Sequence, residues 1–566
     1  MTDLSRWLPF LKWPRPDAGL LRNEFIAGLT VALVMIPQSV AYAGLAGMPL
    51  ITGLYAALLP PLVAVLFGSS TRLSVGPAAL TCILVGTSLT GMAEPGSAHW
   101  VSLAVWLAIL SGVIQLALGA GGFAWILNLV SSPVLLGFTQ AAALLIIASQ
   151  LPAFLGIQPP LSRVFDSPSI DWGALGFGAA SLGLLLSGKR WAPRLPMVVI
   201  VMAAAALVSK YTGYSERGTI IGALPVGLPA PYWPGLPAWE TLGALLVPAM
   251  VIALVSFLET ASSAKIEAQR DGKRWNDNQD LLAQGLAKLT SAFSGSFPTS
   301  TSFSRSAITL FAGAKSGWSA VFTVLFVLAT LLLLAPALYH VPRAVLAAVV
   351  IAAVAGLLKP RALPRLWQID RVEATTAVVT FAVTLLVSPR IYWGVLAGVL
   401  MGLAHFLYHR LHPRIIEAGL HPDGSLRDRR LWELPPLAPA MYALRMDDEL
   451  DFASGSAFER AIIEHLAAHP EVRHVVLFAQ PINRIDATGI EIFEQLRAFL
   501  RERGVTLHIS GFKMPVERVL RKAGALYEDP LLKLYRTDAE ALQAFTNLDQ
   551  AETIQPSSGS RVSGNP

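Results

Sequence analysis

Cysteine is almost absent from this 566-residue sequence, which contains only Cys82. A lone cysteine excludes an internal disulfide and a cysteine metal cluster, and we expect Cys82 to be a small buried apolar residue. Enzyme motifs are missing too, since the sequence has no Walker loop, HExxH, nucleophile elbow or CxxC. We therefore expect neither an ATP-driven pump nor an enzyme, and no metal or cofactor.

Charge is also scarce. Asp, Glu, Lys and Arg make up 14% of the residues and hydrophobic residues 54%, whereas a soluble domain carries about 25% charged residues. Two runs, Phe25–Thr71 and Pro95–Ser162, contain no Asp, Glu, Lys or Arg. Because a membrane-spanning helix needs ~20 apolar residues, each run can hold at least two. The runs predict an α-helical polytopic protein in a lipid bilayer. The net charge of +6 then belongs to cytoplasmic loops and indicates no nucleic acid partner.

Gly, Pro and charged residues divide the apolar part of the chain into about fourteen transmembrane segments. The predicted segments are 24–43, 48–68, 75–92, 100–119, 133–152, 172–188, 195–210, 242–262, 281–296, 302–313, 317–338, 342–358, 372–388 and 391–409. With the N-terminus placed in the cytoplasm, the predicted inner loops carry most of the Lys and Arg residues, as the positive-inside rule requires. The even number of segments places the C-terminus in the cytoplasm as well.

Hydropathy indicates an internal symmetry. A division at the long loop 211–241 gives seven segments in each half, and an odd number gives the halves opposite orientations. The third segment of each half is short or broken, at Ser74–Leu80 and at Ser302–Leu310. Paired interrupted segments indicate a binding site near the middle of the membrane. We therefore predict two inverted repeats, about 24–210 and 242–410.

The ends of the chain differ in composition from its apolar part. Residues 1–23 mix Arg, Lys, Trp and Pro and are predicted to be a cytoplasmic lead-in to the transmembrane region 24–410. Residues 411–436 are predicted to be a charged linker. In 437–548 the apolar runs MYALRM, HVVLFA and TLHISGF alternate with helix-like stretches, which is typical of a small α/β domain. The polar tail 549–566 is predicted to be disordered.

The second broken segment is rich in hydrogen-bond donors. Gly295–Leu310 (GSFPTSTSFSRSAITL) has a Pro, a cluster of Ser and Thr residues and one cation, Arg305. A charge at mid-membrane costs ~2.5–3.5 kcal/mol on insertion scales, so such residues usually face a cavity or a partner. A helix that restarts near Ser302 would direct free N–H groups and a partial positive charge at whatever lies in front of it. We predict an anion site here. The alternative is an Arg305 that extends to the lipid headgroups.

Two other spans carry polar residues that suit a transport site. Glu259 lies late in an otherwise uncharged span, with Ser263 four residues on. Since burial disfavours an ionised carboxyl, Glu259 is a candidate for proton coupling. Alternatively, it pairs with Lys265 or lies among cytoplasmic headgroups. Gln38 and Tyr42 share one face of the first span. They are either neutral donors at a site or polar side chains satisfied by neighbouring helices.

Three stretches resemble a known family. Ala27–Ala79 is similar to the signature region of the sulfate permease (SulP) family, and FPTSTSFSRSA within 281–308 resembles its second hallmark. The C-terminal region is similar to a STAS domain, in which Asn483–Phe493 (NRIDATGIEIF) resembles the strand–loop–helix motif. The family includes sulfate, bicarbonate and dicarboxylate transporters and anion exchangers. The resemblance implies two inverted seven-segment repeats arranged as a core domain and a gate domain, followed by a cytoplasmic α/β STAS domain.

The resemblance also implies roles for individual residues. Segments 1–4 and 8–11 would form the core and the others the gate, and substrate would move by an elevator-like shift of the core. The residues implied to line the substrate site are Gln38, Tyr42, Ala78, Ser302, Ser304 and Arg305. Glu259 matches the acidic position of segment 8, which is Asp in sodium-coupled bicarbonate members. Glu259 therefore favours a proton over sodium as the coupling ion, with Ser263 beside it.

The STAS-like loop departs from its pattern. In anti-sigma-factor antagonists the loop reads Asp-Ser-Ser-Gly and a Ser is phosphorylated, whereas this chain has Asp486, Ala487, Thr488 and Gly489. Asp486 and Thr488 are the candidate regulatory residues, although only Thr488 keeps a hydroxyl. The resemblance further implies a homodimer. A cytoplasmic protein partner or a nucleotide ligand of the STAS-like domain stays open, and no local motif supports either.

These features predict secondary active transport of anions across a bacterial cytoplasmic (inner) membrane. The specific hypothesis is proton-coupled symport of a small inorganic or carboxylate anion. The family resemblance makes sulfate the first candidate, followed by C4-dicarboxylate and bicarbonate. The residues themselves do not choose among these anions, because N–H groups and hydroxyls fit all of them. A different class stays open, namely an uncoupled anion channel or a STAS-based sensor with a vestigial pore.

Overall fold

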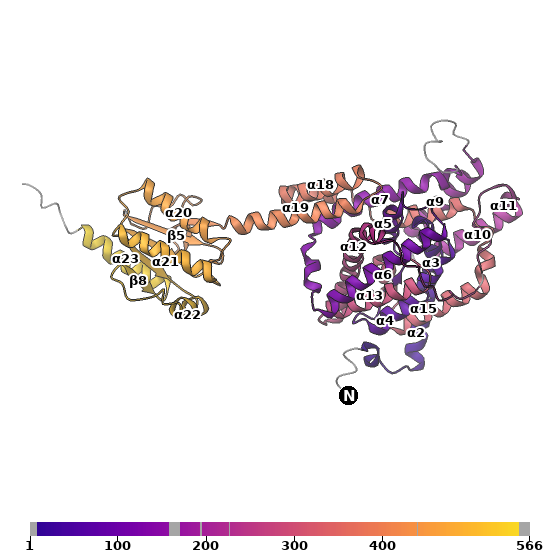
Figure 1. Cartoon of the computed structure of the whole chain (residues 1–566), viewed down its shortest axis with the longest axis horizontal. Helices are drawn as coiled ribbons and strands as arrows, with labels where there is room; N and C mark the ends of the chain where they lie inside the picture. Colours follow the sequence, from indigo (N-terminus) through magenta and orange to yellow (C-terminus); the bar gives the residue numbers. More distant parts are fainter. Residues whose placement is uncertain (1–7, 158–169, 193–194, 226, 439, 554–566) are drawn as a thin grey trace, which may run out of the picture. The chain divides into compact units, whose positions relative to one another are not determined.

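A computed structural model of the chain describes residues 8–157, 170–192, 195–225, 227–438 and 440–553 (Figure 1). The chain divides into two compact units, 1–403 and 404–566. The first unit is helical, and the second contains a six-stranded sheet with helices on both faces.

Helices form nearly all of the regular structure in the described part of the first unit. The α-helices are α2 (Ala18–Leu45), α3 (Ile51–Ala56), α4 (Leu59–Phe67), α5 (Ala79–Leu89), α6 (Ala98–Ala120), α7 (Ser132–Leu155), α9 (Trp172–Trp191), α10 (Met197–Tyr211), α11 (Tyr214–Arg217), α12 (Trp239–Asp271), α13 (Asp277–Phe293), α14 (Phe303–Phe311), α15 (Trp318–Ala329), α16 (Arg343–Ala355), α17 (Ala362–Ile369), α18 (Arg371–Leu386) and α19 (Tyr392–Leu411), the last of which continues into the second unit. Short 3-10 or π segments are η1 (Pro9–Lys12), η2 (Ala124–Leu129), η3 (Thr330–Leu334) and η4 (Ala335–Leu338).

A helix overlaps each of the fourteen predicted apolar segments. The second segment is divided into α3 and α4, because Pro60 and Pro61 start a new helix after the turn at Ala57 and Leu58. Five of the described helices are both long and apolar enough to cross a bilayer, namely α2, α6, α7, α12 and α19. The other apolar helices are shorter, so the number of membrane crossings stays a prediction. Helix α12 continues beyond the predicted end at 262, and Gly272 caps it in the left-handed conformation.

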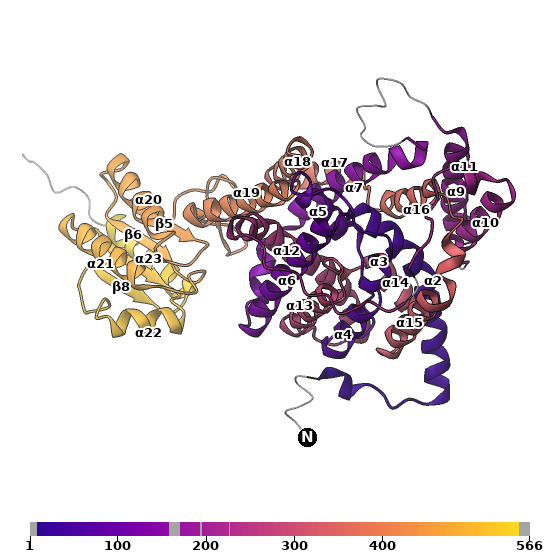
Figure 2. The same ribbon diagram turned by 45° about the vertical axis from the view of Figure 1, so that its right-hand side comes forward.

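The packing of the helices agrees with a core domain and a gate domain. Helix α13 packs on α6 and α4, α15 on α2, and α12 on α5 and α6, which joins helices of the two halves in one bundle. A second bundle is formed by α16 and α18 on α7, with α16 also on α9. Figure 2 shows the same arrangement, with α6, α12 and α13 gathered together and α9, α10 and α11 on the other side of the unit.

Two very short strands cross in the core bundle. β1 (Val75–Gly76) pairs antiparallel with β2 (Ser300–Thr301), with Val75 opposite Thr301 and Gly76 opposite Ser300. The helices α5 and α14 start directly after them. The two broken segments predicted from the sequence therefore meet, and in the antiparallel orientation that inverted halves require.

The second unit is built on a mixed sheet. Its strands are β3 (Ile415–Leu420), β4 (Leu426–Asp428), β5 (Met441–Met446), β6 (His474–Phe478), β7 (Thr506–Ser510) and β8 (Leu532–Tyr535), in the order β4-β3-β5-β6-β7-β8. Its helices are α20 (Gly455–Ala468), α21 (Ala487–Glu502), α22 (Met514–Lys522) and α23 (Asp538–Thr553). Strands β5 to β8 run parallel, and β3 is antiparallel to β4 and β5.

Alternate residues of β5 face opposite sides of this sheet. Tyr442 and Leu444 pack in the cluster that includes residues of α20, α21 and α22, whereas Met441 and Ala443 pack with Phe545 of α23. The period of two is that of a strand with both faces covered. It confirms the strands predicted for MYALRM, HVVLFA and TLHISGF.

The region predicted as a charged linker, 411–436, differs from the expectation. It contains β3 and β4, and β3 is part of the sheet through its pairing with β5. Buried Ile416 and Ala418 lie on either side of the partly buried Glu417, but the surrounding charges obscure this pattern in the sequence. At the other end, α23 extends to Thr553, so the predicted disordered tail 549–566 begins inside a helix. The rest of that tail lies outside the described residues.

Candidate functional site

The starts of α5 and α14 face each other across the crossing of β1 and β2. Ala78 is the N-cap of α5 and has no side chain that accepts a hydrogen bond, while Ser302 caps α14 and accepts from the N–H of Arg305. Free N–H groups and the helix dipole give each start a partial positive charge of about half an elementary charge. Two such ends directed at one place form a ready site for an anion.

Gly76 allows the crossing to close. Its φ angle is +147°, a conformation that is essentially restricted to glycine. A Cβ at this position would lie 2.5 Å from the Cε atom of Met35 on α2 and 3.7 Å from Nη2 of Arg305. Any other residue would be strained by this backbone conformation and would have to move the end of the Met35 side chain.

Arg305 lies behind the crossing and is 0% exposed. Its Nε donates to Oγ of Ser74 at 3.1 Å, Nη1 donates to Oε1 of Gln38 at 3.2 Å, and Nη2 donates to the carbonyl of Pro77 at 2.9 Å. These partners come from α2 and from the segment around β1, so one side chain joins both halves of the chain. All three acceptors are neutral, and the described part of the chain gives Arg305 no ion pair. Full burial also excludes the alternative in which Arg305 extends to headgroups.

Of the other five residues predicted to line the site, three are buried, one is partly buried and one is exposed. Gln38 and Tyr42 are both buried on α2, and Gln38 contacts Arg305 directly. Ala78 is buried at the tip of α5. Ser302 is partly buried and Ser304 is exposed, with their Oγ atoms 3.3 Å apart. The structure thus brings Gln38, Ala78 and Arg305 together, while Ser304 lies at the edge.

Glu259 is connected to strand β2 and to helix α5. Its Oε2 accepts a hydrogen bond from Oγ of Ser300 on β2 at 2.5 Å and from Oγ1 of Thr81 on α5 at 3.4 Å. The alternative partner, Lys265, instead lies over the ring of Trp275 at 5.8 Å. Ser263, predicted to assist Glu259, donates to the main-chain carbonyl of Glu259 at 3.1 Å. In this structure Ser263 supports the helix and not the carboxylate.

Sequence reasoning missed a row of buried polar residues on α13, which no motif marks. Asp280, Gln284 and Lys288 follow one another at intervals of four on α13 and are all buried. Gln284 donates from Nε2 to Oγ1 of Thr301 at 3.2 Å, and Thr301 is 2.8 Å from the hydroxyl of Thr260 on α12. A polar stripe with helical spacing inside an apolar segment was the available signal.

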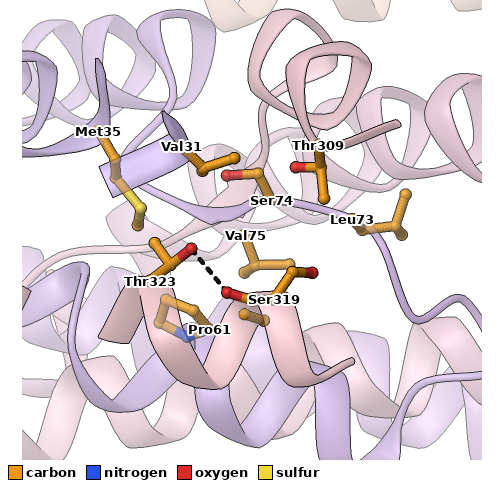
Figure 3. Close-up of a pocket in the computed structure, with 10 residues that line it drawn as sticks. Val31, Met35, Pro61, Leu73, Ser74, Val75, Thr309, Ser319 and Thr323 are labelled. Atoms are coloured by element: carbon orange, nitrogen blue, oxygen red, sulfur yellow. Dashed lines mark hydrogen bonds between the residues drawn. The ribbon is translucent and has the colours of Figure 1, made fainter. Parts of the chain in front are cut away.

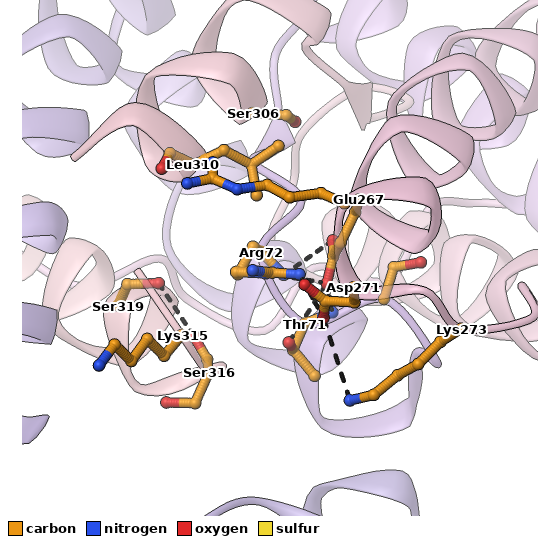
Figure 4. A network of polar contacts seen from close by, with 12 residues as sticks. Thr71, Arg72, Glu267, Asp271, Lys273, Ser306, Leu310, Lys315, Ser316 and Ser319 are labelled. Carbon is orange, nitrogen blue, oxygen red and sulfur yellow. Dashed lines mark hydrogen bonds and ion pairs between the residues drawn. The ribbon is translucent and has the colours of Figure 1, made fainter. Parts of the chain in front are cut away.

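A second polar network fixes the segment that leads into β1. Nε of Arg72 pairs with Glu267 at 3.2 Å and Nη2 pairs with Asp271 at 2.6 Å, and the N–H of Thr71 donates to Glu267 at 3.0 Å (Figure 4). Glu267 and Asp271 lie at the end of α12. These contacts therefore hold Thr71 and Arg72, which lead into β1, against α12, the helix that carries Glu259.

Three cavities lie near these elements. The smallest, about 10 Å³, is lined by Ser74, Thr309, Ser319 and Thr323 among others (Figure 3), which is about the least space that one water molecule needs. A cavity of about 620 Å³ lies between the end of α2 and the gate helices α7 and α16. Another of about 340 Å³ lies between α12 and the start of α7.

The candidate regulatory loop lies at the start of α21. Oδ1 of Asp486 caps the helix by accepting from the N–H of Gly489 at 2.8 Å, and Oδ2 accepts from the N–H of Phe452 at 3.2 Å. Asp486 therefore stabilises the start of α21, and Thr488 is exposed to solvent.

Comparison with known proteins relates this geometry to a family. The Sulfate permease family matches residues 21–380, and the STAS domain matches residues 437–541. The chain is 30% identical to a probable sulfate transporter of Mycobacterium tuberculosis over 93% of this chain and 95% of that protein. It is 28% identical to high affinity sulfate transporter 2 of Stylosanthes hamata, over 95% of this chain and 86% of that one.

Solved structures share the fold. The murine Slc26a9 anion transporter in the inward-facing state matches with a TM-score of 0.85 and 21% identity, covering 96% of this chain and 94% of that one. The transmembrane domain of the cyanobacterium bicarbonate transporter BicA matches with a TM-score of 0.59 and 18% identity, covering 69% of this chain and 99% of that one. The sequence matches extend over most of the chain, and the protein therefore belongs to the sulfate permease family and carries a C-terminal STAS domain.

Proposed function

We propose that this protein is a secondary active transporter that carries sulfate together with protons. The observation that carries the proposal is Arg305, a fully buried cation held by Gln38, Ser74 and the carbonyl of Pro77 directly behind two facing helix starts. A buried charge without a direct ion pair is costly. An anion bound between the helix starts offsets that cost, because it supplies the missing counter-charge.

Glu259 is the proposed proton carrier. Its carboxylate accepts from Ser300 and Thr81, one residue on each side of the crossing. A negative carboxylate so close to the anion site opposes anion binding, whereas a protonated one does not. Proton and anion then bind together, and this is the requirement for symport.

An elevator-like movement of the core domain against the gate domain is the proposed transport step. The two larger cavities support it, because each lies between helices of the two bundles. Leu135 lines one and Ser149 lines the other, and fourteen helical residues between them correspond to about 21 Å along α7. The cavities therefore lie at opposite ends of the same gate helix, where substrate would enter and leave.

The relatives support sulfate as the first substrate. The Mycobacterium tuberculosis and Stylosanthes hamata proteins are both named as sulfate transporters. BicA is named as a bicarbonate transporter, so bicarbonate stays the alternative together with C4-dicarboxylates. We further propose a homodimer in the bacterial cytoplasmic membrane, with both termini in the cytoplasm and the STAS domain available to a protein partner there.

Uptake of radiolabelled sulfate into proteoliposomes tests this function. With an inward proton gradient, the wild-type protein should accumulate sulfate, and Glu259→Gln should abolish gradient-driven accumulation. Accumulation that ignores both the gradient and the substitution would contradict proton coupling and indicate sodium coupling, exchange or an uncoupled channel. If sulfate is not taken up at all, the same vesicles with succinate, fumarate or bicarbonate identify the substrate among the alternatives.

A further inference from the structure

A second cation is buried in the core bundle, and the proposed mechanism does not yet use it. Lys288 on α13 is 0% exposed. Its Nζ donates to Oε1 of Gln115 on α6 at 2.9 Å. Among the described residues, this is the one hydrogen-bond acceptor found for the ammonium group. A buried ammonium group with a single neutral partner is costly, and a nearby negative charge, such as that of a bound anion, favours its charged form.

Close packing of α6 and α13 fixes the position of this lysine. A Cβ at Gly112 would lie 3.0 Å from the carbonyl of Gly285 and 3.2 Å from Cβ of Lys288, and a Cβ at Gly285 would lie 2.7 Å from Leu116. Glycine on both helices lets the backbones approach, as is common between membrane helices. The lysine side chain is therefore confined to the space between α6, α12 and α13.

Hydrogen bonds lead from Lys288 towards the crossing. Nε2 of Gln115 donates to the carbonyl of Ala253 at 2.8 Å and to Oγ of Ser256 at 3.1 Å, both on α12. The carbonyl of Ser256 accepts from Oγ of Ser300 at 3.2 Å, and the same hydroxyl is 2.5 Å from Oε2 of Glu259. Lys288 also interacts electrostatically with Glu259. It therefore belongs to the environment of the proposed proton carrier.

The other ionisable groups near this region are already engaged. Asp280, two turns before Lys288 on the same helix, accepts from Oγ of Ser70 at 2.6 Å and from Nε1 of Trp275 at 2.7 Å. Eight helical residues place its Cα about 12 Å from that of Lys288. Among the described residues, the charged groups linked to the crossing by the contacts above are Arg305, Glu259 and, through Gln115, Lys288. Arg72, Glu267 and Asp271 pair with one another at the approach to β1.

We propose that Lys288, charged when an anion is bound, is a second cation beside the anion site and gives it a preference for divalent anions. The inference rests on the proposed function. With Glu259 protonated, Arg305 and Lys288 together supply two positive charges, which a divalent anion such as sulfate neutralises. With Glu259 ionised, the sum is one, which suits a monovalent anion. Since net charge is costly in a membrane interior, one proton is matched to one sulfate.

Binding of sulfate and of nitrate to the purified full chain tests the charge count. In the wild type, sulfate should bind better than nitrate at a pH where Glu259 is protonated. Lys288→Gln removes the charge, and Gln115→Glu cancels it by placing a carboxylate on the existing 2.9 Å contact. Because sulfate carries one more negative charge than nitrate, the loss of one nearby positive charge at an effective dielectric constant of ~20 should lower the sulfate-to-nitrate affinity ratio roughly tenfold in each variant. Lys288→Arg, which keeps the charge, should retain the wild-type ratio.

The outcomes distinguish an effect of the Lys288 charge on anion binding from a purely structural role of the residue. A ratio within twofold of wild type in both Lys288→Gln and Gln115→Glu would overturn the proposal. An equal loss of both affinities would overturn it as well, because that result marks a purely structural lysine. If Lys288→Gln does not fold, Gln115→Glu still decides, since it alters no atom of the lysine. Failure of the wild type to bind any anion would instead contradict the proposed function on which the inference rests.

Discussion

Replacement of Arg305 by Met removes the buried charge while keeping an unbranched side chain. It leaves the acceptors on Ser74, Gln38 and Pro77 without their donor, at a cost of about 1–3 kcal/mol for each group left unsatisfied. The anion loses its main counter-charge. At an effective dielectric constant of ~20, two charges about 6 Å apart interact by about 2.8 kcal/mol, which is roughly a hundredfold in affinity for a monovalent anion and more for sulfate.

Sulfate affinity of the detergent-solubilised full chain, measured calorimetrically, provides the assay, with thermal unfolding of the same samples as the measure of stability. Arg305→Lys keeps the charge but not the planar fork, so it should lose stability and only about tenfold in affinity. Arg361→Met, at an exposed position, is the matched control and should bind like wild type. If Arg305→Met binds sulfate within threefold of wild type, Arg305 is a structural residue and the assignment of the anion site is wrong.

Three further predictions concern particular residues. Gly76→Ala should destabilise the protein by about 1–3 kcal/mol and lower the unfolding temperature, because its φ is +147° and its Cβ would lie 2.5 Å from Met35; an unchanged unfolding temperature would refute the close crossing. Asp486→Ala should cost about 1 kcal/mol as a lost helix cap, whereas Thr488→Ala should stay within ~0.5 kcal/mol; equal effects in calorimetry would contradict the assigned roles. Burial, followed by nearby basic groups, lowers the pKa of His508 to about 4. The unfolded chain binds a proton near pH 6.5, so stability of the STAS domain should be full above pH 6.5 and fall as the pH drops towards 4. His508→Gln should flatten that part of the pH profile, and an unaltered profile would exclude this histidine as its cause.

The sequence was most informative where one physical constraint dominated. Charge-free runs can satisfy their backbone only as helices in a bilayer, so the helical segments were predictable from composition alone. Gly295–Leu310 combined a proline, hydroxyls and one arginine, and this combination located the broken helix and Arg305. Glu259 was recognisable for the same reason, as a carboxyl in an apolar span.

Contacts between distant parts of the chain were not predictable in this way. Lys288 meets Gln115 across 173 positions, and neither residue has a local motif that announces the other. The direction of Arg305 was also hidden, because its acceptors Gln38 and Ser74 lie 267 and 231 positions away. Strand β3 was missed because its pairing with β5 depends on tertiary context rather than on the charged residues around it.

The most direct measurement is the position of a bound divalent anion. Selenate has the charge and tetrahedral shape of sulfate, and its selenium scatters X-rays anomalously, so crystals of the full chain grown with selenate locate the ion without assumptions. An anomalous peak within hydrogen-bond distance of the free N–H groups at the starts of α5 and α14, beside Arg305, is the predicted result. A peak elsewhere in the chain, with nothing between those helix starts, would contradict the assignment of the anion site.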